Sequence, residues 1–588
     1  MYRMPTPLLN CRDSTVPWRT SMSAATPARY SVGSSRRFKL GLPLLLTLVA
    51  PILASSQAKV SETASTLQST IKVGRLADLR WPVFSDYRIH VDNFYRASGY
   101  ALAWIQQDKP TDRAREMIQI FVQADGEGLN AEDYDGLRWA ERIAHLEGSH
   151  TAQEEARFDL ALTVCAMRYI SDVRIGRINP KHFKFGFDVE HKKLNLPSFL
   201  RQLLSSSADL KSELANIEPP FAGYKATRQA LLRYMELAKE DDGEKLPAPQ
   251  WETLYPGGPY DGVSRLTRLL RLLGDLPKDA VVASDSKTYG GPLPDAVKHF
   301  QTRHGLTATG DLTKATLEQL NVPLQLRVEQ LRLTLERYRW LRYSFTQPPI
   351  VVNLPEYRLK AFDRNGRIGL TMNVNVGDAY DFQTPVFENS IRYLVFRPYW
   401  NVPPRILRDE VIPDIEEDRS YIHDGNMEVI TRDGKVVTSG VISDSVLKQL
   451  RAGSLTVRER PGPENALGLL KIIFPNEHHV YLHDTPESVD MFSTEERALS
   501  HGCIHLQEPA ELAHWLLRDK PGWTMERVEQ AMREGRDNLT VNLTAPVPIL
   551  IVYGTAVVES NGDVHFYRDV YGHDASLKKA LAKGYPYP

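Results

Sequence analysis

The chain has 588 residues, which is too long for a single hydrophobic core and predicts about three or four domains. Hydrophobic residues make up 42% of the sequence and charged residues 25%, a balance typical of soluble globular proteins. The formal net charge of -1 provides no overall attraction to nucleic acid, so we expect no nucleic-acid partner.

An apolar run near the N-terminus has the features of a targeting segment. Basic residues within 36–39 precede the run at 40–54, and small residues at 56 and 58 match a signal-peptidase site. The run is short for a membrane span, which needs roughly 20 residues. Residues 1–58 are therefore predicted to be a cleaved signal peptide or an uncleaved inner-membrane anchor.

The pattern that follows is mostly helical. Residues 59–75 are rich in Ser and Thr and predict a polar tether. Residues 76–250 show apolar side chains at three- and four-residue spacing, which predicts a helical N-terminal domain. A compact unit at 258–322 contains helical runs separated by glycine turns. The amphipathic stretch within 323–347 predicts a long helix that connects this unit to the next domain.

Several residues of the compact unit have the spacing of a known module. The matching positions are Tyr289-Gly290, Ala296-Val297, Phe300-Gln301, Gly305-Leu306, Gly310 and 316–320. This pattern resembles the peptidoglycan-binding-domain-1 family, and the resemblance implies a small three-helix module found on cell-wall enzymes. Two roles stay open for it: contact with the wall, or packing against the neighbouring domains.

From residue 348 the pattern changes to alternating, β-branched residues. It predicts a mainly β domain over 348–575, followed by a polar tail at 576–588. Residues 406–460 are less regular and predict an insertion in this domain. Such an insertion is either a lid over an active site or an ordinary surface elaboration.

The cysteines are too few for a disulfide framework in an exported protein. Cys11 lies in the leader, and Cys165 lies in an apolar helical run, which predicts a buried and unreactive side chain. Cys503 follows a glycine and has histidines nearby, so it is the candidate nucleophile. The alternative is a regulatory disulfide between Cys165 and Cys503.

The stretch 481–506 contains Cys503 together with His483, His501 and His505. No second cysteine lies close, and the alternating positions 501, 503 and 505 are not a zinc spacing, so we expect no metal. A thiol with an ordinary pKa of about 8.5 is mostly protonated at neutral pH and needs a base. An imidazole can accept that proton and later protonate a leaving amine.

The strand pattern favours His483 as this base. In a strand, Tyr481 and His483 share one face, and Asp484 points to the other. We therefore expect the backbone carbonyl of Asp484, and not its carboxylate, to orient His483. Gly502 lets a substrate carbonyl approach the backbone closely, so the amides of Gly502 and Cys503 are the predicted oxyanion donors.

These residues carry a resemblance. The run Ser500-His501-Gly502-Cys503-Ile504, with His483 upstream, resembles the signature of the YkuD-type L,D-transpeptidases. The flanking motifs are similar to those of large, multidomain Gram-negative members: 351–355, 384–386, 400–403, 458–468, Lys471, 474–476, 481–486 and 497–500.

The resemblance implies a multidomain α+β protein. Its parts would be a helical N-terminal domain, a small three-helix peptidoglycan-binding-like module, and a mainly β L,D-transpeptidase catalytic domain with an inserted lid-like subdomain. It also implies a periplasmic protein of a Gram-negative bacterium, secreted or anchored by the N-terminal apolar segment. The implied partners are peptidoglycan stem peptides, with other wall synthases as further candidates, and no cofactor is expected.

The resemblance implies a two-step acyl transfer. Cys503 would attack the carbonyl between the L-centre of meso-diaminopimelate and D-Ala in a tetrapeptide stem, and D-Ala would leave. The side-chain amine of a second diaminopimelate would then resolve the thioester as a 3→3 cross-link. His483 would act first as base and then as acid.

The resemblance also suggests substrate-side residues. Arg497 would anchor a substrate carboxylate or fix its loop through a salt bridge, and Tyr481 would line the cleft or simply pack. His501 is expected to support the loop more than to transfer protons. His505 departs from the family, which often has arginine there. A histidine would hold a stem carboxylate more weakly and in a pH-dependent way.

Two other functions stay open. A cysteine hydrolase on the same scaffold would resolve the thioester with water, and would trim stems or release wall-attached protein. A lid that excludes water would favour transfer over hydrolysis. The other alternative is a wall-binding scaffold without chemistry, against which the presence of Cys503, His483 and Gly502 together argues.

Overall fold

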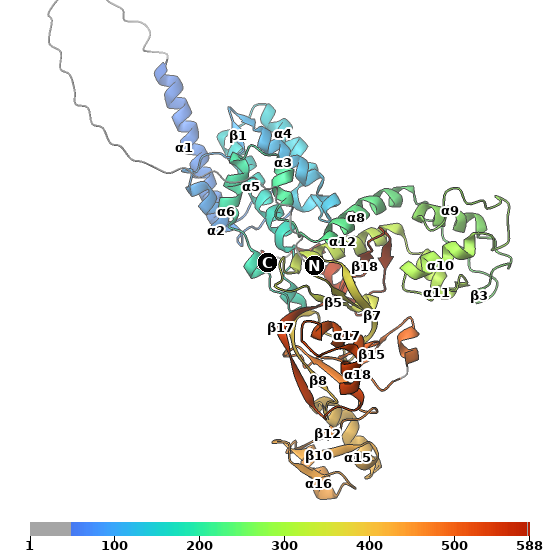
Figure 1. The fold of residues 1–588 in the computed structure, drawn as a ribbon. Coiled ribbons are helices and arrows are strands. Elements are labelled where there is room, and N and C mark those ends of the chain that lie inside the picture. The colour runs from blue at the N-terminus through green and yellow to red at the C-terminus, as the bar shows by residue number, and fades with distance from the viewer. Residues whose placement is uncertain (1–48, 488, 585) are drawn as a thin grey trace, which may run out of the picture.

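The computed structural model describes residues 49–487, 489–584 and 586–588 (Figure 1). They form a helical N-terminal domain, a small helical module, and a β-barrel domain from which a further subdomain projects. The predicted multidomain α+β architecture, with a three-helix module and an insertion in a mainly β domain, is confirmed.

The N-terminal domain is built around one buried helix. Its helices are α1 (Val49–Val73), α2 (Arg88–Arg96), α3 (Asp112–Val122), α4 (Trp139–Glu147), α5 (Ala152–Ile175), α6 (Leu196–Ser205), α7 (Leu210–Ala215) and α8 (Ala222–Glu240). Helix α5 begins at a capping box of Thr151 and Glu154 and is buried over most of its length. Its Cys165 is a free, buried thiol, and burial raises the pKa of this thiol to about 12. Cys503 is also free, so no disulfide joins the two.

The N-terminal predictions need correction. Residues 1–48 of the predicted signal or anchor lie outside the described residues. Residues 59–73 of the expected tether are instead part of α1, where Leu67 and Ile71 are buried and the helix packs on α5. Among the described residues, no helix is long and apolar enough to cross a membrane. This finding contradicts the predicted localisation, a periplasmic protein secreted or anchored by the N-terminal apolar segment.

The small module contains α9 (Val263–Leu273), α10 (Leu293–Arg303), α11 (Lys314–Leu320) and the strand pair β3 (Thr253–Leu254) and β4 (Leu312–Thr313). Buried Gln301 of α10 holds the turn at 310–311 and helix α11 through hydrogen bonds. The Gln301 amide donates to the Asp311 carbonyl at 2.9 Å and to Thr316 Oγ1 at 3.0 Å, and its oxygen accepts from the Gly310 N–H at 2.8 Å. These bonds explain why the matching glutamine and glycine occur together.

The connector helix is α12 (Leu324–Trp340), and it is more buried than its amphipathic pattern predicts. Arg339 is completely buried, with its guanidinium donating to the Glu127 carbonyl at 2.5 Å and to the Tyr224 hydroxyl at 3.0 Å. Arg339 therefore binds the N-terminal domain and does not face solvent.

The β domain is a barrel. Its strands are β5 (Ile350–Asn353), β6 (Arg358–Phe362), β7 (Ile368–Gly377), β8 (Phe387–Phe396), β13 (Leu470–Ile473), β14 (Leu482–His483), β15 (Ala498–Ser500), β16 (Ile504–Leu506) and β17 (Leu539–Val552). They pair in the order β15-β7-β16-β14-β13-β8-β17-β5-β6, and the further pairing of β6 with β7 closes the sheet. Helices α17 (Pro509–Leu517) and α18 (Met525–Arg533) follow β16.

The C-terminal segment is folded, whereas the sequence predicted a polar tail at 576–588. It contains the hairpin of β18 (Ala556–Val558) with β19 (Val564–Phe566) and helix α19 (His573–Lys583). Leu577 and Ala580 of α19 are buried, and the helix packs on α12. The many lysines of this segment had concealed its apolar positions.

The insertion forms a subdomain with its own core, at the bottom of Figure 1. Its strands β9 (Trp400–Asn401), β10 (Met427–Thr431), β11 (Val436–Thr438) and β12 (Leu455–Glu459) form a separate sheet. Its helical segments are α13 (Pro404–Ile406), η7 (Leu407–Val411), α14 (Ile412–Glu417), α15 (Tyr421–Asp424) and α16 (Asp444–Arg451). A separate core means that this subdomain can keep its shape while moving as a unit.

Candidate active site

Strand pairing in the barrel places Lys471, His483 and His505 side by side on three neighbouring strands. Antiparallel β13 and β14 pair Lys471 with His483, and parallel β14 and β16 pair His483 with His505. Paired positions across a sheet lie on the same face. The loop between β15 and β16 carries Cys503 two residues before His505, and the next residue, Ile504, donates its N–H to the Tyr481 carbonyl at 3.0 Å.

His483 is held in one tautomer. Its Nδ1 lies 2.5 Å from the backbone oxygen of Asp484. Because a carbonyl oxygen only accepts, Nδ1 carries the proton and Nε2 has the free lone pair. His483 is 3% exposed, and burial holds its pKa well below the usual value for histidine. The ring is therefore neutral and able to accept a proton.

The carboxylate of Asp484 points away from the thiol. It accepts the N–H of Leu469 and the N–H of Thr485, each at 2.8 Å, and burial raises its pKa. Gly468 lies so close to this side chain that a Cβ at that glycine would be 2.5 Å from the Asp484 carboxyl carbon. The side chain of Asp484 thus fixes the turn before β13, while its carbonyl holds His483.

The Cys503 thiol is half-buried, with Sγ 3.9 Å from the backbone oxygen of His479. Burial raises the pKa of this thiol, and a backbone hydrogen bond from Tyr481 and the positive charge of Lys471 oppose the rise. The thiol is therefore a poor nucleophile unless a base or a cation acts on it.

The predicted oxyanion role of Gly502 needs correction. Its N–H donates to Ser500 Oγ at 3.1 Å, and that hydroxyl donates in turn to the Cys503 carbonyl at 2.6 Å. The Gly502 amide is therefore occupied. The Cys503 N–H has no hydrogen-bond partner among the described residues, so it is the donor that the loop leaves for an oxyanion.

Gly502 instead allows two backbones to meet. Its φ of +105° is one that side-chain-bearing residues rarely adopt. Thr384, 1% exposed, accepts the Gly377 N–H at 2.8 Å and donates to the Gly502 carbonyl at 2.9 Å. A Cβ at Gly377 would lie 1.9 Å from the Phe382 carbonyl oxygen. These contacts fix the thiol loop against the end of β7.

Two further predicted site residues, Tyr481 and Arg497, each contact an aromatic ring or a cation nearby. Tyr481 is half-buried, and its ring centroid is 3.7 Å from Lys471 Nζ. Arg497 donates to the Thr494 carbonyl and lies over the Tyr357 ring, with 5.2 Å from the guanidinium carbon to the ring centroid. Neither partner of Arg497 is a carboxylate, and the predicted salt bridge is absent among the described residues.

His501 and His505 have different surroundings. His501 Nε2 lies 3.1 Å from Glu410 of the inserted subdomain, and the His501 ring is 4.6 Å from that of Phe382. The His505 ring is 4.6 Å from that of His483, and burial lowers the pKa of His505 to about 4. His505 is therefore neutral near pH 7 and supplies no charge to a stem carboxylate, and its Nδ1 is buried without a hydrogen-bond partner.

Three parts of the chain match known families. Residues 348–549 match the L,D-transpeptidase catalytic domain, residues 259–320 a putative peptidoglycan binding domain, and residues 90–231 a scaffold domain. The chain carries an L,D-transpeptidase catalytic domain. The family resemblance in the sequence is confirmed, and the narrower resemblance to large Gram-negative members stays a prediction.

A relative of this L,D-transpeptidase domain occurs in Haemophilus influenzae. It is named a putative L,D-transpeptidase and is 31% identical over 232 residues, which are 39% of this chain and 45% of the relative. The match thus spans less than half of the relative's length. A solved structure from Clostridium acetobutylicum, a fused Zn-dependent amidase/peptidase/peptidoglycan-binding domain-containing protein, is 12% identical and covers 51% of this chain and 99% of that chain. The TM-score of this match is 0.14.

Residues that the sequence left without a role lie close to the thiol of the L,D-transpeptidase domain. They are Lys471, Thr384, Ser500 and Glu410. Lys471 had a signal, since it is a lone lysine in the apolar run 469–474. Thr384 lies in the matching motif 384–386, but its role had no signal, and Glu410 had none at all, because each reaches the thiol loop across about a hundred residues of sequence.

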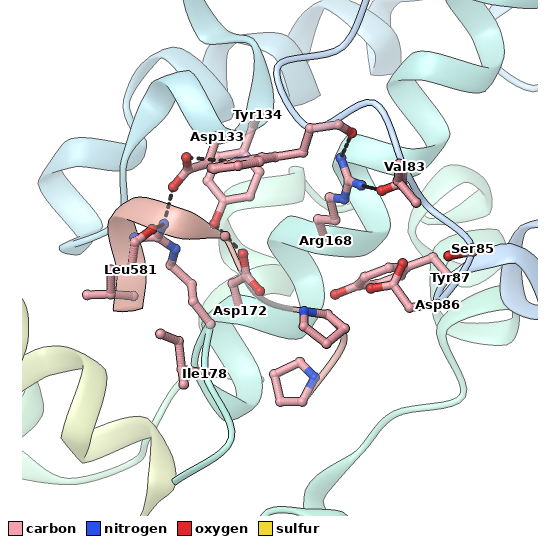
Figure 2. Close-up of a pocket in the computed structure, with 15 residues that line it drawn as sticks. Val83, Ser85, Asp86, Tyr87, Asp133, Tyr134, Arg168, Asp172, Ile178 and Leu581 are labelled. Carbon is pink, nitrogen blue, oxygen red and sulfur yellow. Dashed lines mark hydrogen bonds and ion pairs between the residues drawn. The ribbon is translucent and has the colours of Figure 1, made fainter. Parts of the chain in front are cut away.

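A cavity of about 260 Å³ is lined by residues within 81–178 of the N-terminal domain and 581–588 of the C-terminal segment (Figure 2). No residue of 481–506 lines it. Arg168 donates to the carbonyls of Trp81 and Val83 at 3.0 and 2.7 Å, and Tyr134 donates to Asp172 at 2.7 Å. Burial raises the pKa of Asp172 to about 7. These hydrogen bonds join Trp81, Val83 and Tyr134 to helix α5. In the described part of the chain, no group of three or more His, Cys, Asp or Glu side chains could hold a metal ion.

Proposed function

We propose that the protein is a peptidoglycan L,D-transpeptidase that forms 3→3 cross-links between meso-diaminopimelate residues of stem peptides. The observation that carries this proposal is the free Cys503 thiol just before strand β16, which pairs with the strand of His483, together with the hold of the Asp484 carbonyl on His483 Nδ1. The match of residues 259–320 to a putative peptidoglycan binding domain supports peptidoglycan as the substrate.

In the first step, His483 Nε2 accepts the Cys503 proton as Sγ attacks the carbonyl carbon between diaminopimelate and D-Ala. An S–C bond forms, and the Cys503 N–H stabilises the oxyanion. The C–N bond to D-Ala then breaks, and the leaving nitrogen takes the proton from His483. The product is a thioester, with D-Ala released.

In the second step, the side-chain amine of another diaminopimelate attacks the thioester carbon. A C–N bond forms and the C–S bond breaks. The amine gives up a proton through His483, and the Cys503 thiol is regenerated. The contact between His501 and Glu410 supports transfer over hydrolysis, because it joins the inserted subdomain to the thiol loop, where the subdomain can restrict water.

The test incubates the full chain with a disaccharide carrying a tetrapeptide stem and analyses the products by mass spectrometry. Cross-linked dimer with loss of D-Ala is the expected result, and Cys503→Ala should form none while keeping the wild-type unfolding transition. Tripeptide without dimer would replace transfer by hydrolysis. Dimer formed by the alanine variant would overturn the mechanism.

A further inference from the structure

Lys471 lies in the barrel wall beside the proposed catalytic pair. Three of the four residues of strand β13 are buried. The fourth is Lys471, which is half-buried and lies between buried Leu470 and Ile472. The register of β13 with β14 puts Lys471 directly opposite His483. A lysine at such a position has to give up part of its hydration.

The ammonium group has an aromatic partner and no anionic one. Lys471 Nζ lies 3.7 Å from the centroid of the Tyr481 ring, which is a cation–π contact. Among the described residues, no carboxylate lies within 4.0 Å of this nitrogen. Burial lowers the pKa of Lys471 to about 8, and the neighbouring Cys503 opposes this shift. Because no carboxylate neutralises it, the Lys471 ammonium can stabilise another negative charge nearby.

Among the described residues, Lys471 is the cation whose charge opposes the rise in the pKa of the thiol. The titratable groups around it are Lys471 on β13, Tyr481 and His483 at β14, His505 on β16, His501 on its own loop with Glu410 of the inserted subdomain against it, and Tyr393. His483 and His505 are held neutral by burial. Neither of these two rings therefore supplies an imidazolium to a Cys503 thiolate in the resting protein.

We propose that Lys471 is a positioning residue whose ammonium, held over the Tyr481 ring opposite His483, stabilises the Cys503 thiolate. The same charge offsets the negative charge on sulfur when the thioester collapses and the thiolate leaves. This second role rests on the proposed function, whereas stabilisation of the thiolate in the free protein does not. Lys471 transfers no proton in either role.

The test measures alkylation of Cys503 by iodoacetamide as a function of pH, with mass spectrometry assigning the label. Lys471→Met should raise the pKa of the thiol and slow alkylation at pH 7 by about tenfold, since one pKa unit changes the thiolate fraction tenfold. Lys471→Arg keeps the charge and should keep most of the rate. Lys298→Met, which changes a half-exposed lysine of the small module, is the matched control and should change nothing.

An unchanged thiol pKa in Lys471→Met would overturn the proposal, because a purely structural lysine would not affect the pH profile. If methionine disturbs the barrel, as a shifted urea transition would reveal, Lys471→Gln provides the same comparison. Alkylation needs no peptidoglycan. A wild-type protein that is alkylated as expected yet forms no cross-links would refute the proposed function and leave the role of Lys471 standing.

Discussion

Replacement of Thr384 by valine tests whether the thiol loop depends on a hydroxyl far away in the sequence. The side chain is 1% exposed, and its oxygen joins the Gly377 N–H at 2.8 Å to the Gly502 carbonyl at 2.9 Å. Valine has nearly the same shape, so packing changes little. Both backbone groups would lose their partner in a place that water does not reach.

Each buried group left without a hydrogen bond costs about 1–3 kcal/mol, so the loss of two in Thr384→Val should lower the free energy of unfolding by about 2–6 kcal/mol. Thr384→Ser keeps the hydroxyl and loses only a methyl group, which costs about 1 kcal/mol. Urea unfolding measures both values. Because the Gly502 carbonyl is next to Cys503, the valine variant should also form the thioester more slowly, while the serine variant should not.

The result that would refute this reasoning is a valine variant within about 0.5 kcal/mol of the wild type, the range of an ordinary surface substitution. Equal losses in the valine and serine variants would also count against it. That outcome would show that the methyl group matters and the hydrogen bonds do not.

Three other substitutions address the base, the close backbone contact and a buried carboxyl. His483→Ala should slow thioester formation by about a hundredfold or more, and a near-normal rate would remove His483 as the base. Gly377→Ala should lower the free energy of unfolding in urea by at least about 1–3 kcal/mol, because its Cβ would lie 1.9 Å from the Phe382 carbonyl oxygen. A Cβ at Gly290 would meet nothing within 4 Å, so the free energy of unfolding of Gly290→Ala should equal that of the wild type. Asp172 keeps its proton up to a pKa of about 7 in the folded state, so the stability it contributes is lost as pH rises from about 4 to about 7. Asp172→Asn should flatten the pH dependence of unfolding over that window, and an unchanged slope would contradict the assignment.

The sequence predicts most of the fold because the periodicity of apolar residues reports burial directly. It fails where buried polar residues look like solvent-facing ones. The arginines of α12 alternate with leucines as on an exposed helix, yet Arg339 is buried against the Glu127 carbonyl and Tyr224. These partners lie more than a hundred residues away, so no local pattern could reveal them.

The site shows the same limit on a smaller scale. Strand alternation is enough to separate the side chain of Asp484 from its carbonyl, because both follow from local geometry. The hydrogen-bond partner of the Gly502 N–H could not be predicted from local geometry. Ser500 competes for it over two residues, and whether that hydroxyl turns inward depends on the Cys503 carbonyl that it also binds. A small change in loop conformation therefore decides which amide is free.

The neutral histidines restrict how Cys503 can react. If His483 alone activates the thiol, the proton moves only while sulfur attacks, and the rate should not follow a thiolate titration. If Lys471 stabilises the thiolate beforehand, the rate should rise with pH up to the pKa of the thiol. Lys471 itself has a pKa of about 8, so above that pH its charge is lost, the thiol becomes harder to ionise, and the rise in rate should become shallower. A rise that stays steep above pH 8 in Lys471→Arg would therefore assign the shallower part to this lysine, because arginine stays charged throughout.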